Sequence, residues 1–91
     1  MTDKKPSVLF VCKRNGGKSQ IAAGFAKLHA GEDLIVDSAG TEPGDSLNQE
    51  SIDALDEVGV DITNESPKLA TPELVNSYDL VVILGDQAKL P

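Results

Sequence analysis

The chain has 91 residues, 40% of them hydrophobic, and a formal net charge of −7 at pH 7, which allows one small domain with a modest core. Its pI near 4.4 argues against a nucleic acid partner, because binding to phosphate backbones needs a basic face. The longest apolar run, residues 80–84, is far shorter than the roughly 18 residues that indicate a membrane span, so no membrane partner is expected.

The single cysteine offers no intrachain disulfide, and the apolar stretch at residues 7–12 is too short for a signal peptide. We therefore expect a reducing, cytoplasmic location. The charge is unevenly distributed: residues 1–31 carry six of the eight Lys and Arg residues and one acid, and residues 32–91 carry the other 14 acids. The local field around residues 13–18 is therefore positive and suits a small anion.

Residues 7–12, SVLFVC, form an almost continuous apolar run, which predicts a strand buried on both faces, as in a parallel sheet. In residues 18–30 the apolar positions recur at i, i+4 and i+7, which predicts an amphipathic helix that Gly31 ends. A second strand is predicted at residues 34–36, closed by Ser, Ala and Gly a little further on. Pro and Gly then predict a loop at residues 41–45.

A second helix is predicted to begin at one of two cap candidates, Ser46 or Asn48, and to end at Gly59. After an irregular stretch, Thr, Pro and Glu supply a cap, a first-turn proline and an acid for a short helix at residues 71–75. A third strand is predicted at residues 78–84. This order of apolar strands and helices predicts an α/β fold with a parallel sheet and right-handed crossovers.

The loop between the first strand and the first helix is predicted to bind an anion. Asn15, Gly16 and Gly17 tolerate positive φ, and successive residues of that kind turn their N–H groups toward one point. The positive end of the following helix reaches the same point. A tetrahedral oxyanion is the natural ligand.

The same loop supports different interpretations. Gly17, Lys18 and Ser19 match the end of the nucleotide-binding pattern G-x-x-x-x-G-K-[ST], but the first glycine of that pattern falls at Cys12. Asp86 after the third strand weakly imitates a Mg²⁺-binding acid, although three strands are few for such a fold. A buried, inert cysteine is the third interpretation.

We favour an interpretation in which Cys12 is a nucleophile. The N–H groups, Lys18 and the helix terminus all stabilise a thiolate at this position, and Ser19 is placed to donate a hydrogen bond to the sulfur. The sulfur would then lie beneath a bound oxyanion, ready for in-line attack.

Motifs along the whole chain resemble the low-molecular-weight protein-tyrosine-phosphatase family, and within it the arsenate reductase branch. The loop sequence Asn-Gly-Gly-Lys-Ser-Gln is similar to that of the actinobacterial, mycothiol-linked arsenate reductases. The matching motifs are Val8-Leu9-Phe10-Val11-Cys12, Asn15, Ser19-Gln20, Ser38-Ala39-Gly40-Thr41, Leu47-Asn48, Gly59-Val60-Asp61-Ile62 and Asp79-Leu80-Val81.

The resemblance implies a three-layer fold with a parallel sheet of strand order 2-1-3 and helices on both faces. It implies that Cys12 is the nucleophile, that Ser19 tunes its thiolate, and that Asn15 orders the loop with Ser38 as its partner. The oxyanion cradle would be formed by Lys13, Arg14, Asn15, Gly16, Gly17, Lys18 and Ser19.

Lys18 stands where the family usually has arginine. Lysine is a point charge and cannot grip two oxygens with a planar fork, and this departure weakens the phosphatase interpretation more than the arsenate one. Gly85 stands where thioredoxin-coupled relatives carry a further cysteine. We therefore expect no bound cofactor and no metal, but an external thiol such as mycothiol, together with a mycoredoxin- or glutaredoxin-like protein.

The chain ends at Pro91, where the family continues with another strand, a loop bearing the general acid, and a last helix. We therefore expect a single domain, 1–91, that lacks these elements. Its third strand would be left as an apolar edge that favours dimerisation. Asp79 and Asp86 are candidates for the general acid only by default.

The sequence thus predicts a thiol-dependent arsenate reductase that acts on a bound arsenate or similar oxyanion. A phosphatase acting on phosphotyrosine or small phosphomonoesters is the alternative. A non-catalytic module that binds oxyanions is a further one.

Overall fold

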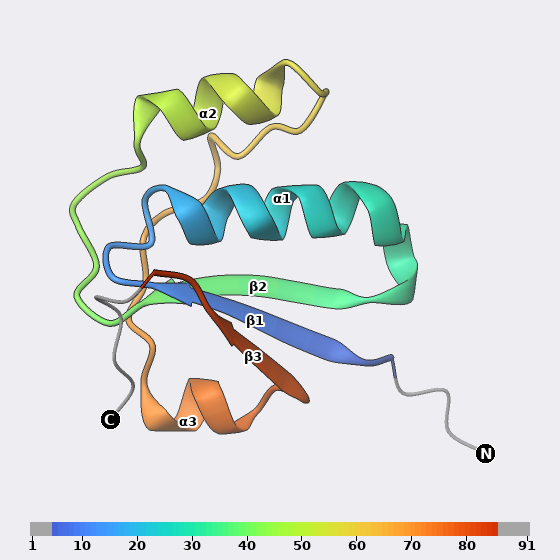
Figure 1. The fold of residues 1–91 in the computed structure, drawn as a ribbon, viewed down its shortest axis with the longest axis vertical. Helices are drawn as coiled ribbons and strands as arrows, with labels where there is room; N and C mark the ends of the chain where they lie inside the picture. Colours follow the sequence, from blue (N-terminus) through green and yellow to red (C-terminus); the bar gives the residue numbers. More distant parts are fainter. Residues whose placement is uncertain (1–4, 86–91) are drawn as a thin grey trace.

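The computed structural model describes residues 5–85, which form a three-stranded parallel sheet with helices on both faces (Figure 1). The strand order β2-β1-β3 confirms the predicted order 2-1-3, and the predicted α/β class is confirmed. The elements in chain order are β1 (Ser7–Cys12), α1 (Lys18–Ala30), a 3₁₀ turn (Gly31–Asp33), β2 (Ile35–Gly40), α2 (Gln49–Asp56), α3 (Pro72–Asn76) and β3 (Leu80–Ile83).

The sheet separates two apolar clusters, because successive side chains of each strand point to opposite faces. One cluster lies between the sheet and α3 and is centred on Leu9, Val11, Ala39 and Ala70. The other lies between the sheet and α1 and is centred on Val8, Ala23 and Val36. The central strand β1 contributes to both clusters, which explains its almost continuous apolar sequence.

Helix α2 packs on α1, on the side of α1 that faces away from the sheet (Figure 1). The close approach is made at Gly24 of α1, where a Cβ atom would lie 2.8 Å from both Cδ atoms of Leu55. Leu55 is fully buried. The absence of a side chain at Gly24 therefore lets the two helices approach each other.

The caps of α2 and α3 follow the sequence prediction. Of the two candidates for α2, Asn48 is the cap, and its Oδ1 accepts a hydrogen bond from the amide of Glu50 (2.8 Å). Thr71 caps α3 through a bond from the amide of Leu74 to its Oγ1 (3.1 Å), with Pro72 in the first turn.

Strand β2 is longer than predicted and β3 is shorter. β2 continues past Asp37 to Gly40, which pairs with Cys12 at the carboxyl end of β1. The segment before α3, which the sequence left irregular, pairs with the end of β2. The amide of Gly40 donates a hydrogen bond to the carbonyl of Lys68, and the carbonyl of Gly40 accepts one from the amide of Ala70 (both 2.8 Å). Within residues 5–85, the helices fall short of the length and apolar character that a bilayer crossing requires.

Candidate active site

The loop of residues 12–19 joins the carboxyl end of β1 to the amino end of α1, the predicted ligand-binding position in a parallel sheet (Figure 1). It borders a cavity of about 580 Å³, within the usual size range of ligand pockets. The other walls come from the segment before α2 and from the residues that follow β3. The lining residues are Cys12, Lys13, Arg14, Gly16, Gly17, Lys18, Gly44, Ser46, Leu47, Asn48, Leu84 and Gly85.

The carbonyl groups of this loop are bound by the neighbouring segment, residues 41–48. The carbonyl oxygens of residues 12, 13, 14 and 16 accept hydrogen bonds from the amides of Thr41 (3.0 Å), Glu42 (2.7 Å), Gly44 (3.0 Å) and Asn48 (2.7 Å). A peptide unit points its N–H roughly opposite to its C=O, so fixing the carbonyls on this segment leaves the loop amides facing away from it.

Several loop amides are left without a protein acceptor. Within residues 5–85, the amides of Lys13, Arg14, Gly16, Gly17 and Lys18 donate no hydrogen bond to the protein. Helix α1 also begins without a side-chain cap and without an acid in its first turn. Free N–H groups and a helix N-terminus at one point form an anion cradle.

Cys12 lies at the base of this cradle and is 6% exposed. Its Sγ accepts a hydrogen bond from the amide of Asn15 (3.1 Å) and lies 2.9 Å from the Oγ of Ser19. Both groups stabilise a thiolate if they donate. The direction of the Ser19 bond follows from the partners of Asn15.

Asn15 fixes the direction of that bond. Its Oδ1 accepts from the backbone amide of Lys68 (2.9 Å), which can only donate, so its Nδ2 is the atom that faces Ser19 (2.8 Å). The Ser19 oxygen therefore accepts from Asn15, and its own proton is free to be donated to the sulfur of Cys12 when that sulfur is a thiolate, which can only accept. A chain of hydrogen bonds thus runs from Lys68 through Asn15 and Ser19 to the nucleophile.

Asn15 is fully buried and adopts φ = 57°, in the left-handed region, as the sequence suggested. The prediction that Ser38 is the hydrogen-bond partner of Asn15 is wrong. The hydrogen bonds of the described residues include none between Ser38 and Asn15, and the backbone of Lys68 provides the contact instead. The reason is register: Ser38 pairs with Phe10, two residues before the loop begins.

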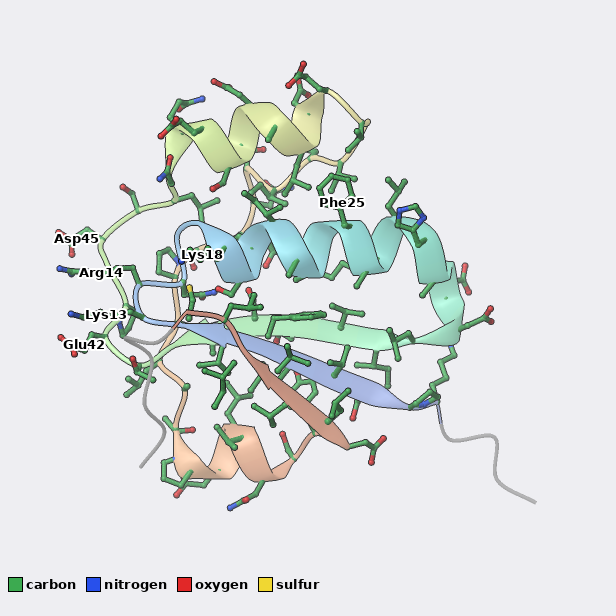
Figure 2. The ribbon with its side chains drawn as sticks, viewed as in Figure 1. Lys13, Arg14, Lys18, Phe25, Glu42 and Asp45 are labelled. Carbon is green, nitrogen blue, oxygen red and sulfur yellow. The ribbon has the colours of Figure 1, made fainter. Side chains whose placement is uncertain are left out.

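The predicted cations surround the cradle from different sides. Figure 2 shows Lys13 and Arg14 on the same side of the molecule as Glu42 and Asp45, two rim acids that the sequence did not identify as part of the site. Lys18 lies at the start of α1, where a Cβ atom at Gly85 would be 3.4 Å from its Nζ. Lys18 is therefore the cation placed between the loop and the end of β3.

Of the two default candidates for a general acid, Asp79 does not reach the cradle. Asp79 accepts hydrogen bonds from the amide (2.9 Å) and hydroxyl (3.3 Å) of Ser7, at the opposite end of β1 from Cys12, so this candidate is wrong. Asp86 lies outside the described residues.

Sequence reasoning missed Gly40 and the backbone of Lys68. A Cβ atom at Gly40 would lie 2.7 Å from the carbonyl oxygen of Lys13 and 2.9 Å from the amide nitrogen of Asn15. Only glycine therefore lets the end of β2 pack directly against the backbone of the loop. The one available signal was the motif Ser38-Ala39-Gly40-Thr41, to which no contact with the loop was assigned.

Arsenate reductases are among the most similar proteins. The chain is 38% identical over 85 residues to the arsenate reductase of Bacillus licheniformis, which covers 92% of the chain and 60% of that protein. It is 40% identical over 82 residues to the arsenate reductase of Bacillus subtilis, which covers 89% of the chain and 58% of that protein. The chain thus spans about 60% of the length of these relatives.

Solved structures of both reductases and phosphatases share the fold. A thioredoxin-dependent arsenate reductase of Corynebacterium glutamicum matches with a TM-score of 0.86 and 32% identity, over 100% of this chain and 47% of that one. A low molecular weight protein tyrosine phosphatase of T. tengcongensis matches with a TM-score of 0.82 and 28% identity, over 92% and 61%. The model for low molecular weight phosphotyrosine protein phosphatase matches residues 7–90, and the chain therefore belongs to that family.

Proposed function

We propose that this chain carries the reaction centre of a thiol-dependent arsenate reductase. The observation that carries the proposal is the sulfur of Cys12, which lies beneath a cradle of unpaired amides and accepts hydrogen bonds from Asn15 and Ser19. An anion held by those amides presents its central atom to the sulfur, an arrangement that suits in-line attack.

The proposed chemistry begins with nucleophilic attack. The Cys12 thiolate forms a bond to arsenic, and one oxygen of arsenate leaves as water after it gains protons from solvent. An external thiol then attacks the arsenic, and Cys12 departs as a thiolate that the Ser19 hydroxyl stabilises. A second thiol attacks the sulfur of this new adduct. A disulfide forms, the electron pair of the S–As bond stays on arsenic, and arsenite is released.

Two observations favour arsenate over a phosphate ester. Lys18 supplies a single charge where a planar arginine fork would grip two equatorial oxygens of a transferring phosphoryl group. Relatives that are 38% and 40% identical to the chain are named arsenate reductases, and a solved arsenate reductase in the phosphate binding state matches with a TM-score of 0.84 and 36% identity.

Mycothiol is the proposed external thiol, and a mycoredoxin- or glutaredoxin-like protein the proposed second one. Residues 1–91 contain one cysteine, so the thiol that resolves the Cys12 adduct comes from outside these residues. The loop sequence resembles that of mycothiol-linked reductases, which supports this choice. The cytoplasm, where such thiols stay reduced, is the proposed location.

The test measures arsenite released from arsenate by this chain. We expect release with mycothiol and mycoredoxin, no release with thioredoxin and its reductase, and loss of release in Cys12→Ser. Phosphate binding should persist in Cys12→Ser, because the amides of the cradle remain. Absence of arsenite with either thiol system, combined with intact phosphate binding, would contradict the proposal and leave an oxyanion-binding module.

A phosphatase is the second candidate, supported by the likeness to the phosphatase of T. tengcongensis. In this reaction Cys12 attacks phosphorus, the alcohol leaves with a proton from an acid, and water hydrolyses the phosphocysteine. Hydrolysis of an aryl phosphate at a higher kcat/KM than arsenate reduction, abolished in Cys12→Ser, would favour this candidate.

A further inference from the structure

A polar cluster lies on the face of β2 opposite to α1. Asp37 pairs in register with Leu9, whose side chain belongs to the cluster beneath α3. Its carboxylate forms an ion pair with Lys68 and accepts hydrogen bonds from the hydroxyl of Tyr78 (3.1 Å) and the amide of Ser38 (2.8 Å). Three segments that are distant in sequence therefore meet at one carboxylate.

The contacts in the cluster favour a charged Asp37 and a neutral Tyr78. Burial opposes ionisation of Asp37, but the hydrogen bond from Lys68, the amide of Ser38, the charge of Lys68 and the hydroxyl of Tyr78 more than offset it and keep the pKa of Asp37 below its usual value. Burial, together with the charge of Asp37 and the hydrogen bond to it, raises the pKa of Tyr78 to about 12. A charged Asp37, a charged Lys68 and a neutral Tyr78 thus form one unit.

Lys68 connects this cluster to the active site. Its side chain binds Asp37 on one side, and its backbone amide donates to Oδ1 of Asn15 on the other. Its carbonyl accepts from Gly40, the glycine that supports the loop. Residue 68 lies in none of the described helices and strands, so these contacts, together with the bond from the amide of Ala70 to Gly40, set its position.

We propose that Lys68, held by Asp37, whose carboxylate Tyr78 also binds, is a positioning residue that sets the direction of the Ser19 hydrogen bond to Cys12. An asparagine amide has two orientations of nearly equal shape. With the backbone N–H of Lys68 at Oδ1, Nδ2 faces Ser19 and the Ser19 proton points to the sulfur. In the reverse orientation Oδ1 would face Ser19, and the hydroxyl would donate to the amide instead.

The ion pair itself contributes little to stability. The Lys68 side chain is 41% exposed and that of Asp37 25% exposed, and such pairs are weak stabilisers. Loss of the pair should therefore change the placement of residue 68, and with it the reactivity of Cys12, more than it changes the free energy of unfolding. A merely structural role predicts the opposite.

The test follows the alkylation of Cys12 by iodoacetamide against pH in the full chain. Lys68→Met should slow the reaction at neutral pH by about three- to tenfold, the loss of one hydrogen bond to the thiolate, and move the profile to higher pH. Tyr78→Phe should do the same to a smaller extent, and Lys68→Arg should retain the original profile. Lys27→Met, on the exposed end of α1, is the matched control and should have no effect. The charged groups around the loop, Lys13, Arg14, Lys18, Glu42 and Asp45, are the same in every variant.

A double-mutant cycle separates this role from a general loosening of the fold. In a Ser19→Ala background the last bond of the chain is missing, so Lys68→Met should cause no further slowing. Full, additive slowing in that background would overturn the proposal, as would an unchanged profile in both Lys68→Met and Tyr78→Phe. If circular dichroism shows that Lys68→Met is unfolded, the same double-mutant cycle is measured with Tyr78→Phe in its place. Alkylation requires no arsenate, so this result is independent of the proposed reaction.

Discussion

Asn15 combines a backbone role with a side-chain role that no other residue type fills. Its φ of 57° costs most residues roughly 1–2 kcal/mol, a cost that glycine avoids and asparagine tolerates. Glycine, however, has no side chain to connect Lys68 to Ser19. Gly16 and Gly17, which the sequence also allowed to adopt positive φ, do not do so, and Asn15 is the one residue of the loop in this conformation.

Lys18→Arg should shift the preference of the site from arsenate toward phosphate esters. An arginine fork adds a charge-assisted hydrogen bond to the transferring phosphoryl group, so the ratio of kcat/KM for an aryl phosphate to kcat/KM for arsenate should rise about tenfold. Lys13→Arg, the same substitution on the rim, is the control and should leave the ratio close to its original value. An unchanged ratio in Lys18→Arg would show that this position does not select the anion.

Tyr78 should make stability depend on alkaline pH. Its pKa is about 12 in the folded chain, against 10.0 for the free group, so the neutral phenol is favoured by folding. Its contribution is complete below pH 10 and is lost as the pH rises from 10 toward 12. Urea unfolding at about pH 9 and about pH 11 should show a smaller loss in Tyr78→Phe than in the original chain, and equal losses would contradict this sign.

At the scale of elements, sequence patterns located what is local and missed what depends on distant partners. The apolar run of β1 and the helical spacing of α1 predicted both elements at their observed bounds. The end of β2 was not predicted, because Asp37 resembles a solvent-exposed residue until its partners, 31 and 41 positions away, are known. The support of Asn15 was missed for the same reason, since its partner is a backbone amide 53 positions away.

Gly40→Ala should impair the cradle through the end of β2. The added Cβ would meet backbone atoms of Lys13 and Asn15 at 2.7–2.9 Å, so the loop must move. Phosphate affinity, measured by titration calorimetry, should fall by about tenfold or more if two amides lose their alignment. Gly44→Ala has nothing within 4 Å of its Cβ and serves as the matched control. Equal affinities in the two variants would contradict the role of Gly40.

The effect of Gly24→Ala on the free energy of unfolding should change sign when Leu55, its contact on α2, is removed. Gly24→Ala adds a methyl group 2.8 Å from Leu55 and should destabilise the chain by about 1–2 kcal/mol, because overpacking outweighs the gain in helix propensity. Leu55→Ala should cost about 2–5 kcal/mol by opening a cavity. In the Leu55→Ala background, Gly24→Ala should instead stabilise by about 1 kcal/mol. Urea unfolding checks this cycle, and destabilisation in both backgrounds would contradict it.

At the scale of the whole molecule, the strand order leaves β3 at an edge of the described sheet. Leu80 is 58% exposed and Ile83 is 45% exposed, and their partners Val8 and Val11 belong to clusters on opposite faces. Apolar surface is therefore open on both faces beside an unpaired strand. Such an edge is suited to pairing with another chain.

Self-association through β3 should depend on protein concentration. Sedimentation velocity of the chain should show dimer or larger species at higher concentration. Leu80→Lys should shift the distribution toward monomer, because a charge on an edge strand opposes pairing. Glu73→Lys, an exposed position in α3, controls for the added charge. A monomer at all concentrations in the original chain would contradict the predicted dimer.

The bonds between residues 41–48 and the loop carbonyls mean that the cradle is assembled before any anion arrives. An incoming anion exchanges its hydration water for amides that are already aligned, so no folding of the loop limits the encounter. Such a preset socket recognises shape and charge, which arsenate and phosphate share. Phosphate in excess would therefore occupy the same socket, and under the proposed reaction the rate of arsenate turnover would depend on the ratio of the two anions as much as on the chemistry at the sulfur.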